Sequence, residues 1–295
     1  MARAMVLCAG LGTRLRPLTD ELPKPLLPLG DRSLLEHALD ALSEAGLGPD
    51  VVVNVHHLAS AFEVAARRAP LRVRLVHEAE IRGTAGGIAG ARALLGPAPV
   101  VAMIGDAVLG GVPADFADSA RDGGLVLALQ PRPGRTGNVG VGRHGEIVRL
   151  RGERFGEEQS SGEYVGLLAL GARALGELPE RGCYIADYAL PLLRRGARVG
   201  TYAYERSAVF PGDEVAAYFE ANLRWLRARN APSFVAADGA LGSGVELDRV
   251  LVGAGARLEG AGRATRVLLL PGARALAPLS DAIVLPSGRV VPVPP

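Results

Sequence analysis

Residues 5–19 read MVLCAGLGTRLRPLT, an apolar run that passes directly into a loop with two glycines and two arginines. The apolar run is typical of a buried parallel strand. In the loop, Gly10 and Gly12 allow backbone N–H groups to turn toward one point, and such a nest binds anions. The stretch therefore predicts an α/β fold whose first strand leads into a phosphate-binding loop.

Lys24 follows this loop, between Pro23 and Pro25, and is the only lysine among 33 Lys and Arg residues. A lone lysine in a chain that otherwise uses arginine indicates a site at which a guanidinium cannot replace an ammonium. Lysine offers a compact point charge that suits one phosphate oxygen at close range. The two prolines stiffen the backbone from which its side chain starts, and Arg14 would add a forked donor.

Three other phosphate-binding patterns are excluded by the letters of the loop. The chain has no Gly-x4-Gly-Lys-Ser/Thr string. Leu15 stands where a dinucleotide-binding loop needs its third glycine. A protein-kinase loop would need a distant lysine on a strand, whereas the single lysine here lies directly after the loop.

Composition limits the class of protein. With 295 residues, of which 48% are hydrophobic, we expect one large domain or two. A net charge of +2 gives no general attraction to nucleic acid or membranes. Cys8 and Cys183 form neither a disulfide framework nor a zinc pattern. Because no apolar run has the length of a signal-peptide core or a membrane span, we expect a reduced, cytoplasmic location.

Strands and helices alternate through the first half of the chain. Apolar runs predict strands at 51–55, 73–77 and 99–104, and helical periodicity predicts helices at 35–45, 58–68 and 86–95. This alternation predicts a parallel sheet whose ligands bind beyond the carboxyl ends of its strands. From residue 125 the pattern changes to strands with hairpin-like turns, at 139–141, 147–150 and 164–170, followed by helices at 184–195 and 216–229. The sheet is therefore expected to be mixed.

The last 65 or so residues are rich in Gly, Ala, Val and Leu. Gly255-Ala256-Arg257 recurs as Gly272-Ala273-Arg274, and aliphatic residues lie six apart in the pairs Val252/Leu258 and Leu270/Leu276. Hexad spacing predicts one or two coils of a parallel β-helix; an irregular tail or a plain meander is the other interpretation. So short a segment must be stabilised by packing against the main domain or against another subunit. Of the two, we expect a homo-oligomer.

The segments Gly10–Thr19 and Pro23–Pro25 resemble the sugar-1-phosphate nucleotidyltransferases nearly letter for letter. The resemblance extends to about residue 230. It implies a Rossmann-like nucleotidyltransferase domain at 1–230 with a mixed, mostly parallel sheet. The segment at 231–295, beyond the resemblance, is the one for which the hexad spacing predicts a β-helix, which we expect to be left-handed. The resemblance also implies a reaction in which a sugar 1-phosphate attacks the α-phosphorus of an NTP, pyrophosphate leaves and Mg²⁺ assists.

The resemblance assigns roles to individual residues. Arg14 would hold the leaving phosphates, Lys24 would neutralise charge where the two substrates meet, and Asp106 would bind Mg²⁺. The nucleotide would be held by the loop after the first strand and by the turn Gly83-Thr84-Ala85-Gly86, that is by Ala9, Gly10, Leu11, Gly12, Thr13, Gly83 and Thr84. The sugar would be held by Gly140, Glu153 and Gly166.

The resemblance fails at one position. Many members of the family carry a second metal-binding aspartate before the long helix, and here Pro211 or Phe210 takes its place. Asp213 is the nearest carboxylate and the candidate replacement. The missing aspartate keeps a second interpretation open, that of a weak or inactive nucleotide-sugar-binding regulatory subunit. Gly-Thr-Ala-Gly resembles the mannose-1-phosphate guanylyltransferase branch, with a MurNAc- or heptose-phosphate nucleotidyltransferase as the alternative.

Overall fold

The computed structural model describes residues 3–47, 50–69, 71–97 and 99–294, and its contacts divide the chain into two compact units. Unit 1 comprises the residues up to Gly10 together with Leu35–Val209, and unit 2 comprises Leu11–Leu34 together with Phe210–Pro295. These bounds differ from the expected 1–230 and 231–295. The reason is that the segment Leu11–Leu34 and the long helix pack with the C-terminal strands rather than with the large sheet.

Unit 1 is built on a ten-stranded mixed sheet, which confirms the predicted α/β class. Its parallel part has the order β6-β1-β4-β5, formed by Val100–Ile104, Arg3–Leu7, Asp50–Val55 and Arg72–His77. The antiparallel part continues from β6 through β12 (Ser160–Leu170) to a hairpin of β9 (Val139–Val141), β10 (Ile147–Leu150) and β11 (Glu153–Arg154). A side branch carries β8 (Leu125–Arg132) and β13 (Gly200–Ala203).

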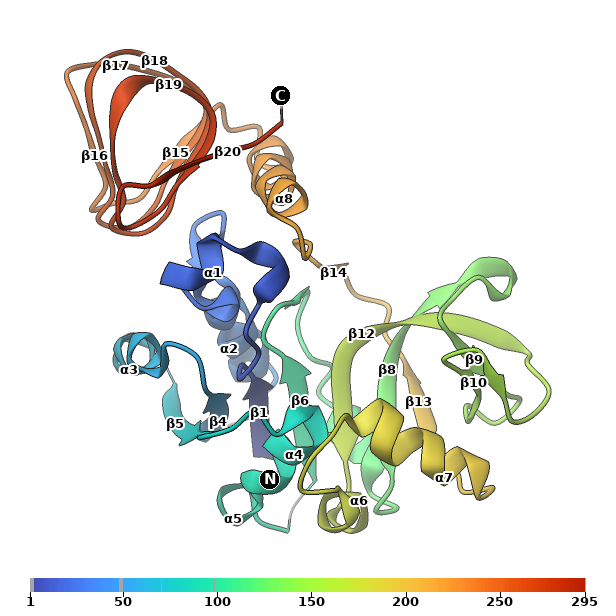
Figure 1. Cartoon of the computed structure of the whole chain (residues 1–295). Coiled ribbons are helices and arrows are strands. Elements are labelled where there is room, and N and C mark those ends of the chain that lie inside the picture. The colour runs from blue at the N-terminus through green and yellow to red at the C-terminus, as the bar shows by residue number, and fades with distance from the viewer. Residues whose placement is uncertain (1–2, 48–49, 70, 98, 295) are drawn as a thin grey trace. The chain divides into compact units, whose positions relative to one another are not determined.

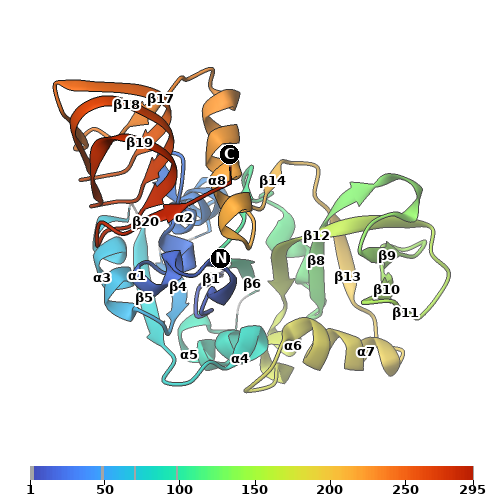
Figure 2. The ribbon, with the colours of Figure 1, turned by 45° about the horizontal axis from the view of Figure 1, so that its top comes forward.

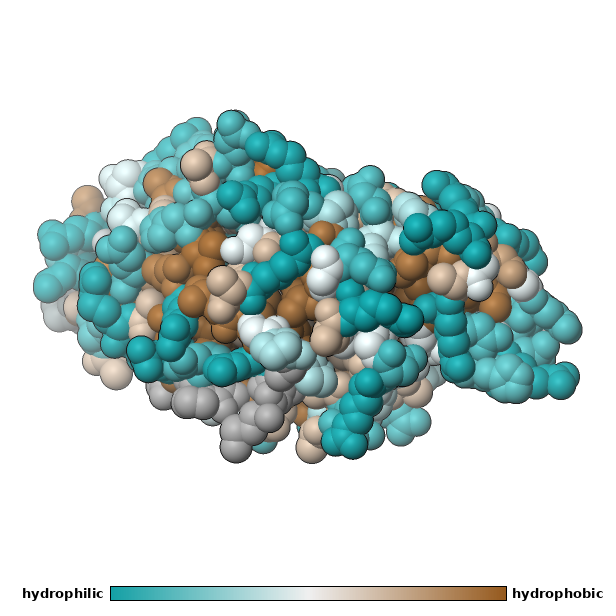
Figure 3. Space-filling view, turned by 90° about the horizontal axis from the view of Figure 1, so that it is seen from below, coloured by the Kyte–Doolittle hydropathy of each residue, from teal (hydrophilic) through white to brown (hydrophobic). Residues whose placement is uncertain are grey.

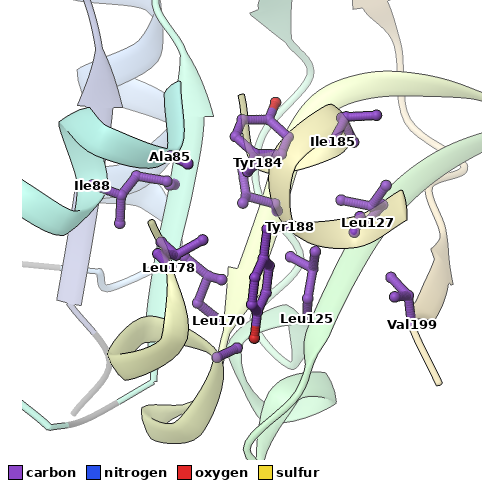
Figure 4. Packing of buried hydrophobic residues seen from close by; sticks show 14 of the residues in the cluster. Ala85, Ile88, Leu125, Leu127, Leu170, Leu178, Tyr184, Ile185, Tyr188 and Val199 are labelled. Carbon is purple, nitrogen blue, oxygen red and sulfur yellow. The ribbon is translucent and has the colours of Figure 1, made fainter. Parts of the chain in front are cut away.

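Helices α4 (Gly83–Gly90), α6 (Ala172–Glu177) and α7 (Leu190–Arg194) lie in a row along this sheet (Figures 1 and 2). Buried aliphatic and tyrosine side chains fill the space between them and the strands, as Figure 4 shows for Ile88, Leu170 and Tyr188. The remaining helices of unit 1 are α2 (Leu34–Glu44), α3 (Ala59–Arg68) and α5 (Arg92–Leu95). The helix expected at 184–195 is a π-helical turn, Tyr184–Ala189, followed by α7.

The carboxyl ends of the parallel strands meet at one edge of the sheet. Leu7, at the end of β1, pairs with Asn54 on β4 and with Ile104 on β6. Val55 pairs with His77 at the end of β5. This register brings residues that come after different strands side by side.

Unit 2 contains α8 (Val215–Ala228), α1 (Leu18–Glu21), the short hairpin of β2 (Pro28–Leu29) and β3 (Arg32–Ser33), and a six-stranded C-terminal sheet. Its long strands β17 (Gly244–Val252), β18 (Arg257–Leu269) and β19 (Arg274–Val284) pair in parallel and stack around a common axis (Figure 1). Shorter strands complete it: β15 (Phe234–Val235), β16 (Ala240–Leu241) and β20 (Val290–Pro292).

The spacing of the C-terminal coils differs from the predicted multiple of six. Val252 pairs with Leu269, 17 residues further on, and Arg257 pairs likewise with Arg274. The recurring Gly-Ala-Arg triplets are thus in register. Of the hexad pairs, Val252 and Leu258 are both fully buried, whereas in the second pair Leu270 is buried and Leu276 is 68% exposed. After a shift between Gly260 and Ala264, the pairing of β18 with β19 is 15 residues apart. The spacing between paired residues of successive strands therefore changes along the stack.

The face shown in Figure 3 is mainly hydrophilic, as expected when the apolar side chains lie in buried cores. In Figure 3, hydrophilic residues cover most of the face in view and hydrophobic residues show mainly in hollows between them. Among the described residues, no helix has both the length and the apolar character needed to cross a membrane.

The β2–β3 hairpin is clamped onto α8. Asn222, fully buried, accepts a hydrogen bond from Gly30 N–H at 2.8 Å, and the Tyr218 hydroxyl donates to Pro28 C=O at 2.6 Å. Gly30 has φ +70°, and a Cβ built on it would lie 1.9 Å from Cε2 of Trp225. Gly30 is therefore required both for its backbone conformation and for the close approach of α8.

We predict that Gly30→Ala lowers the free energy of unfolding by about 3 kcal/mol, because left-handed strain and overpacking add. Gly46→Ala is the matched control, since Gly46 has φ +68° and a Cβ there would meet nothing within 4 Å. The control should lose only the strain, about 1 kcal/mol. Urea denaturation of the three proteins measures both, and equal losses would contradict the packing of Trp225 against Gly30.

Candidate functional site

The loop after β1 folds back on itself at Gly12. Gly12 has φ +62°, and a Cβ there would lie 2.9 Å from Cγ2 of Thr19 and 3.2 Å from Cβ of Lys24. The Thr19 hydroxyl donates to Gly12 C=O at 2.9 Å, which closes the loop. Among the described residues, the N–H groups of Leu11 and Gly12 have no hydrogen-bond acceptor. Exposed N–H groups of this kind are what an anion-binding loop requires.

Two cations of unit 2 converge on one carboxylate. Lys24 Nζ lies 2.5 Å from Asp213 Oδ1, and a guanidinium nitrogen of Arg14 lies 2.8 Å from Asp213 Oδ2. The Lys24 side chain is 12% exposed, whereas that of Arg14 is 73% exposed. The hydrogen bond from Lys24 lowers the pKa of Asp213, and the nearby charges of Lys24 and Arg14 lower it further. The structure therefore brings predicted residues Arg14 and Lys24 together around an ionised carboxylate.

This arrangement bears on the candidate metal ligands. Lys24 and Arg14 pair with the two oxygens of Asp213, so a metal ion bound there would share the carboxylate with both cations or displace them. Asp106 comes after β6, and Mg²⁺ is often held by one protein carboxylate together with phosphate oxygens and water. No group of three or more His, Cys, Asp or Glu side chains suited to a metal occurs within the described residues.

Asp106 lies near the end of β1 and near the π-helical turn. The N–H of Gly105 donates to Leu7 C=O at 2.9 Å, which ties the loop after β6 to β1. Burial raises the pKa of the Cys8 thiol, and the charge of Asp106 raises it further. Burial likewise raises the pKa of the Tyr184 hydroxyl, with a smaller contribution from Asp106.

The predicted turn Gly83-Thr84-Ala85-Gly86 is the first turn of helix α4. Gly83 has φ +76°, and a Cβ there would lie 2.5 Å from Gly182 C=O. Ala85 N–H donates to Gly182 C=O at 2.8 Å, and Gly182 N–H donates to Arg82 C=O at 2.7 Å. The segment Gly182–Tyr184 is thus joined to this helix start, a partner that sequence reasoning missed because the two lie about a hundred residues apart.

Among the described residues, the Thr84 hydroxyl takes part in one hydrogen bond, as the acceptor. Its hydroxyl oxygen accepts a hydrogen bond from Tyr184 N–H at 3.2 Å, which leaves its O–H as a donor. The Tyr184 and Tyr164 hydroxyls lie 2.8 Å apart, and burial raises the pKa of both. These tyrosines stay neutral and can act only as hydrogen-bonding groups. No motif or spacing in the sequence indicates that Tyr164 and Tyr184 form a pair.

The three predicted sugar residues have different surroundings. A Cβ on Gly140 would lie 2.7 Å from both Arg149 Cβ and Glu158 Cδ, so this glycine makes room for a buried ion pair. Glu153 on β11 binds Arg194 of α7. Gly166 has φ +78° at an irregularity in β12, and a Cβ there would lie 2.3 Å from Cδ1 of Ile104, close to Asp106 in the chain. Of the three, Gly166 is the one that packs beside the strand leading to Asp106.

Comparison with known proteins points to one family. Residues 3–142 match the nucleotidyl transferase family. The N-acetylmuramate α-1-phosphate uridylyltransferase of Caulobacter vibrioides is 44% identical over 103 residues, which are 33% of this chain and 42% of that protein. The mannose-1-phosphate guanylyltransferase catalytic subunit beta of Xenopus tropicalis is 39% identical over 97 residues, 32% of this chain and 27% of that protein. The chain thus matches less than half the length of these relatives.

Solved structures share the fold. HddC from Yersinia pseudotuberculosis superposes with a TM-score of 0.62 at 17% identity, over 76% of this chain and 100% of that one. Apo UDP-glucose pyrophosphorylase superposes with a TM-score of 0.59 at 18% identity, over 78% and 100% of the two chains. Both likenesses support the α/β nucleotidyltransferase fold.

We predict that Asp213→Asn tightens the binding of inorganic tripolyphosphate about fivefold, because Lys24 and Arg14 lose the anion that competes for them. Glu214→Gln is the matched control. It removes the same charge one position away, from an exposed side chain that makes no side-chain contact among the described residues. Titration calorimetry measures both affinities. Unchanged or weaker binding by Asp213→Asn would mean that the carboxylate holds the cations in place instead of competing for them.

The same carboxylate should make stability depend on acid pH. The pKa of Asp213 is lowered on folding from its ordinary value of 3.8. Its contribution to stability is therefore fully present above about pH 3.8 and is lost as the pH falls through the lowered, folded-state pKa. Urea denaturation at several pH values should show wild type and Asp213→Asn converging below about pH 3.8. A difference that persisted at the lowest pH would contradict this assignment.

Proposed function

We propose that this chain, which belongs to the sugar-1-phosphate nucleotidyltransferase family, joins the nucleoside monophosphate part of an NTP to a sugar 1-phosphate. A phosphate oxygen of the sugar 1-phosphate attacks the α-phosphorus and forms the new P–O bond. The bond from the α-phosphorus to the oxygen bridging to the β-phosphorus breaks, and pyrophosphate leaves with the electron pair. Such an in-line displacement depends on positioning and charge neutralisation and needs no covalent intermediate.

The observation that carries this proposal is the convergence of Lys24 and Arg14 on Asp213. The carboxylate of Asp213 marks a point where an anion is held by a largely buried ammonium and an exposed guanidinium. In the proposed reaction Lys24 neutralises the α-phosphate region, and Arg14 binds the leaving phosphates. The backbone of Ala9–Thr13 holds the phosphates as well.

The remaining roles belong to the same proposal. Gly83 and Thr84 bind the base, with the Thr84 hydroxyl as donor. Gly140, Glu153 and Gly166 line the sugar site, and Asp106 holds Mg²⁺, which when bound supplies positive charge to the phosphates. Residues 1–230 act as the nucleotidyltransferase part, and residues 231–295 form a left-handed β-helix that supports a homo-oligomer.

The relatives' names direct the choice of substrates. GTP with mannose 1-phosphate is the pair we favour, and UTP with N-acetylmuramate 1-phosphate is the alternative. Pyrophosphate release, measured with Mg²⁺ and a panel of NTPs and sugar 1-phosphates headed by these two pairs, tests the function. An absence of release with every pair, combined with measurable binding of an NDP-sugar, would instead support a regulatory subunit.

We predict that Lys24→Arg lowers kcat for pyrophosphate release about 100-fold, because a guanidinium spreads its charge over two nitrogens where one oxygen must be contacted. The control is Arg16→Lys, the reverse exchange at an exposed side chain of the same loop, 56% exposed and paired only with Asp20 among the described residues. The control should keep its activity within about twofold, as surface ion pairs contribute little. Full turnover by Lys24→Arg would refute the special role of lysine.

A further inference from the structure

Two buried polar side chains lie at the carboxyl edge of the parallel strands without a role in the site described so far. Asn54, near the end of β4, is 2% exposed, and Glu78, directly after β5, is 5% exposed. Both belong to unit 1. Burying a carboxylate and an amide is unfavourable unless their hydrogen bonds are satisfied, so their partners indicate what they do.

The partners form a chain of hydrogen bonds across three adjacent strands. Cys8 N–H, just beyond β1, donates to Asn54 Oδ1 at 2.9 Å. Asn54 Nδ2 donates to Glu78 Oε1 at 2.7 Å, and Arg82 N–H donates to Glu78 Oε2 at 2.9 Å. Each oxygen of the carboxylate thus accepts one N–H, and Glu78 has no ion pair among the described residues.

Two further contacts fix Glu78 and the helix after it. His56 Nδ1 lies 2.8 Å from Glu78 C=O, within hydrogen-bonding distance. A Cβ on Gly87 would lie 2.5 Å from Asn54 Nδ2 and 2.9 Å from Glu78 Oε1, so α4 rests directly on the pair. The two ends of the chain of hydrogen bonds are backbone groups. One is Cys8, before Ala9 and Gly10, and the other is Arg82, before Gly83 and Thr84.

We propose that Asn54 and Glu78 are positioning residues that set the separation between Ala9–Gly10 and Gly83–Thr84, and thereby the enzyme's choice between nucleotide bases. This inference rests on the proposed function, which assigns both segments to the nucleotide. A pair that bridges two backbone N–H groups at a fixed spacing holds one segment against the other. Apolar side chains of similar volume would stabilise the sheet equally well, but they would not hold these two backbone groups.

The geometry allows a test by exchange of donor and acceptor. In Glu78→Gln, one side chain can no longer accept from both Asn54 and Arg82. In Asn54→Asp, two carboxylates face each other. In the double variant Asn54→Asp/Glu78→Gln, Cys8 N–H donates to the first side chain, the amide of the second donates back to it, and Arg82 N–H still finds an oxygen. All three hydrogen bonds and the net charge are restored.

The readouts are kcat, KM for the NTP and the ratio of kcat/KM between GTP and UTP, with the thermal midpoint measured alongside. Each single variant should raise KM for the preferred NTP about tenfold and lower the GTP/UTP ratio, with a smaller effect on kcat. The double variant should return both quantities to within about threefold of wild type. If the single variants fail to fold, the test is the double variant, which should fold and show KM and a GTP/UTP ratio within about threefold of wild type.

The matched control is Asp50→Asn. Asp50 lies at the opposite end of the same strand, where Arg74 binds it at 2.7 Å, and its loss removes a carboxylate without touching the chain of hydrogen bonds. It should lower the thermal midpoint and leave the GTP/UTP ratio unchanged. Unchanged selectivity in the single variants, or a double variant no better than they are, would overturn the inference.

Failure of the proposed function is distinguishable from failure of this inference. If wild type releases no pyrophosphate with any substrate pair, the proposed reaction is wrong. The affinities of the same variants for GTP and UTP, measured by equilibrium dialysis, then give the comparison without turnover. Loss of discrimination in the single variants with recovery in the double variant would still support the inference, and its absence would reject it.

Discussion

The segment that carries Arg14 and Lys24 depends on one apolar core, which it shares with the C-terminal part of the chain. Leu15, Leu18 and Leu27 pack in a single cluster with apolar side chains of α8 and of the stacked coils, namely Tyr218, Phe219, Leu223, Leu226, Leu251, Leu268, Leu270, Ile283, Leu285 and Val293. Glu21 adds two hydrogen bonds to Ser287, at 2.9 and 2.6 Å. Since the segment Leu11–Leu34 has little regular structure of its own, burial against these elements is what holds its conformation. The C-terminal coils therefore support the loop that carries Arg14 and Lys24 by packing against its leucine side chains.

The carboxyl edge of the large sheet is organised by a different kind of force. There polar side chains at or just after the strand ends add buried hydrogen bonds to the apolar packing. Asn54 and Glu78 connect the segment after β1 with the segment after β5. Gly182–Tyr184 closes the start of α4 from its other side. Directional bonds of this sort fix positions more narrowly than apolar packing does, which suits segments that must hold a ligand in register.

Local patterns in the sequence predicted most of the elements but not their partners. The strands at 51–55 and 73–77 follow from apolar runs. The helix at 216–229 follows from periodicity, because burial of one face imposes a regular spacing. The contact between Lys24 and Asp213 spans 189 positions and leaves no local pattern. The hexad spacing did not give the pairing between coils, which is 17 residues apart at Val252 and Leu269, because that pairing is set by the length of the corners as well as by the apolar stripe. The burial of Glu78 leaves no local pattern either, because burial is a property of the fold.

The single lysine finds its physical reason in this geometry. Its Cβ lies 3.2 Å from the point where a side chain on Gly12 would begin, its ammonium lies 2.5 Å from Asp213 Oδ1, and its side chain is only 12% exposed. A compact ammonium fits so enclosed a place, whereas a planar guanidinium needs more room. Arg14 reaches the other oxygen from solvent, where a guanidinium can spread without hindrance. The two cations thus differ in their surroundings: the ammonium of Lys24 is largely enclosed, whereas the guanidinium of Arg14 extends into solvent.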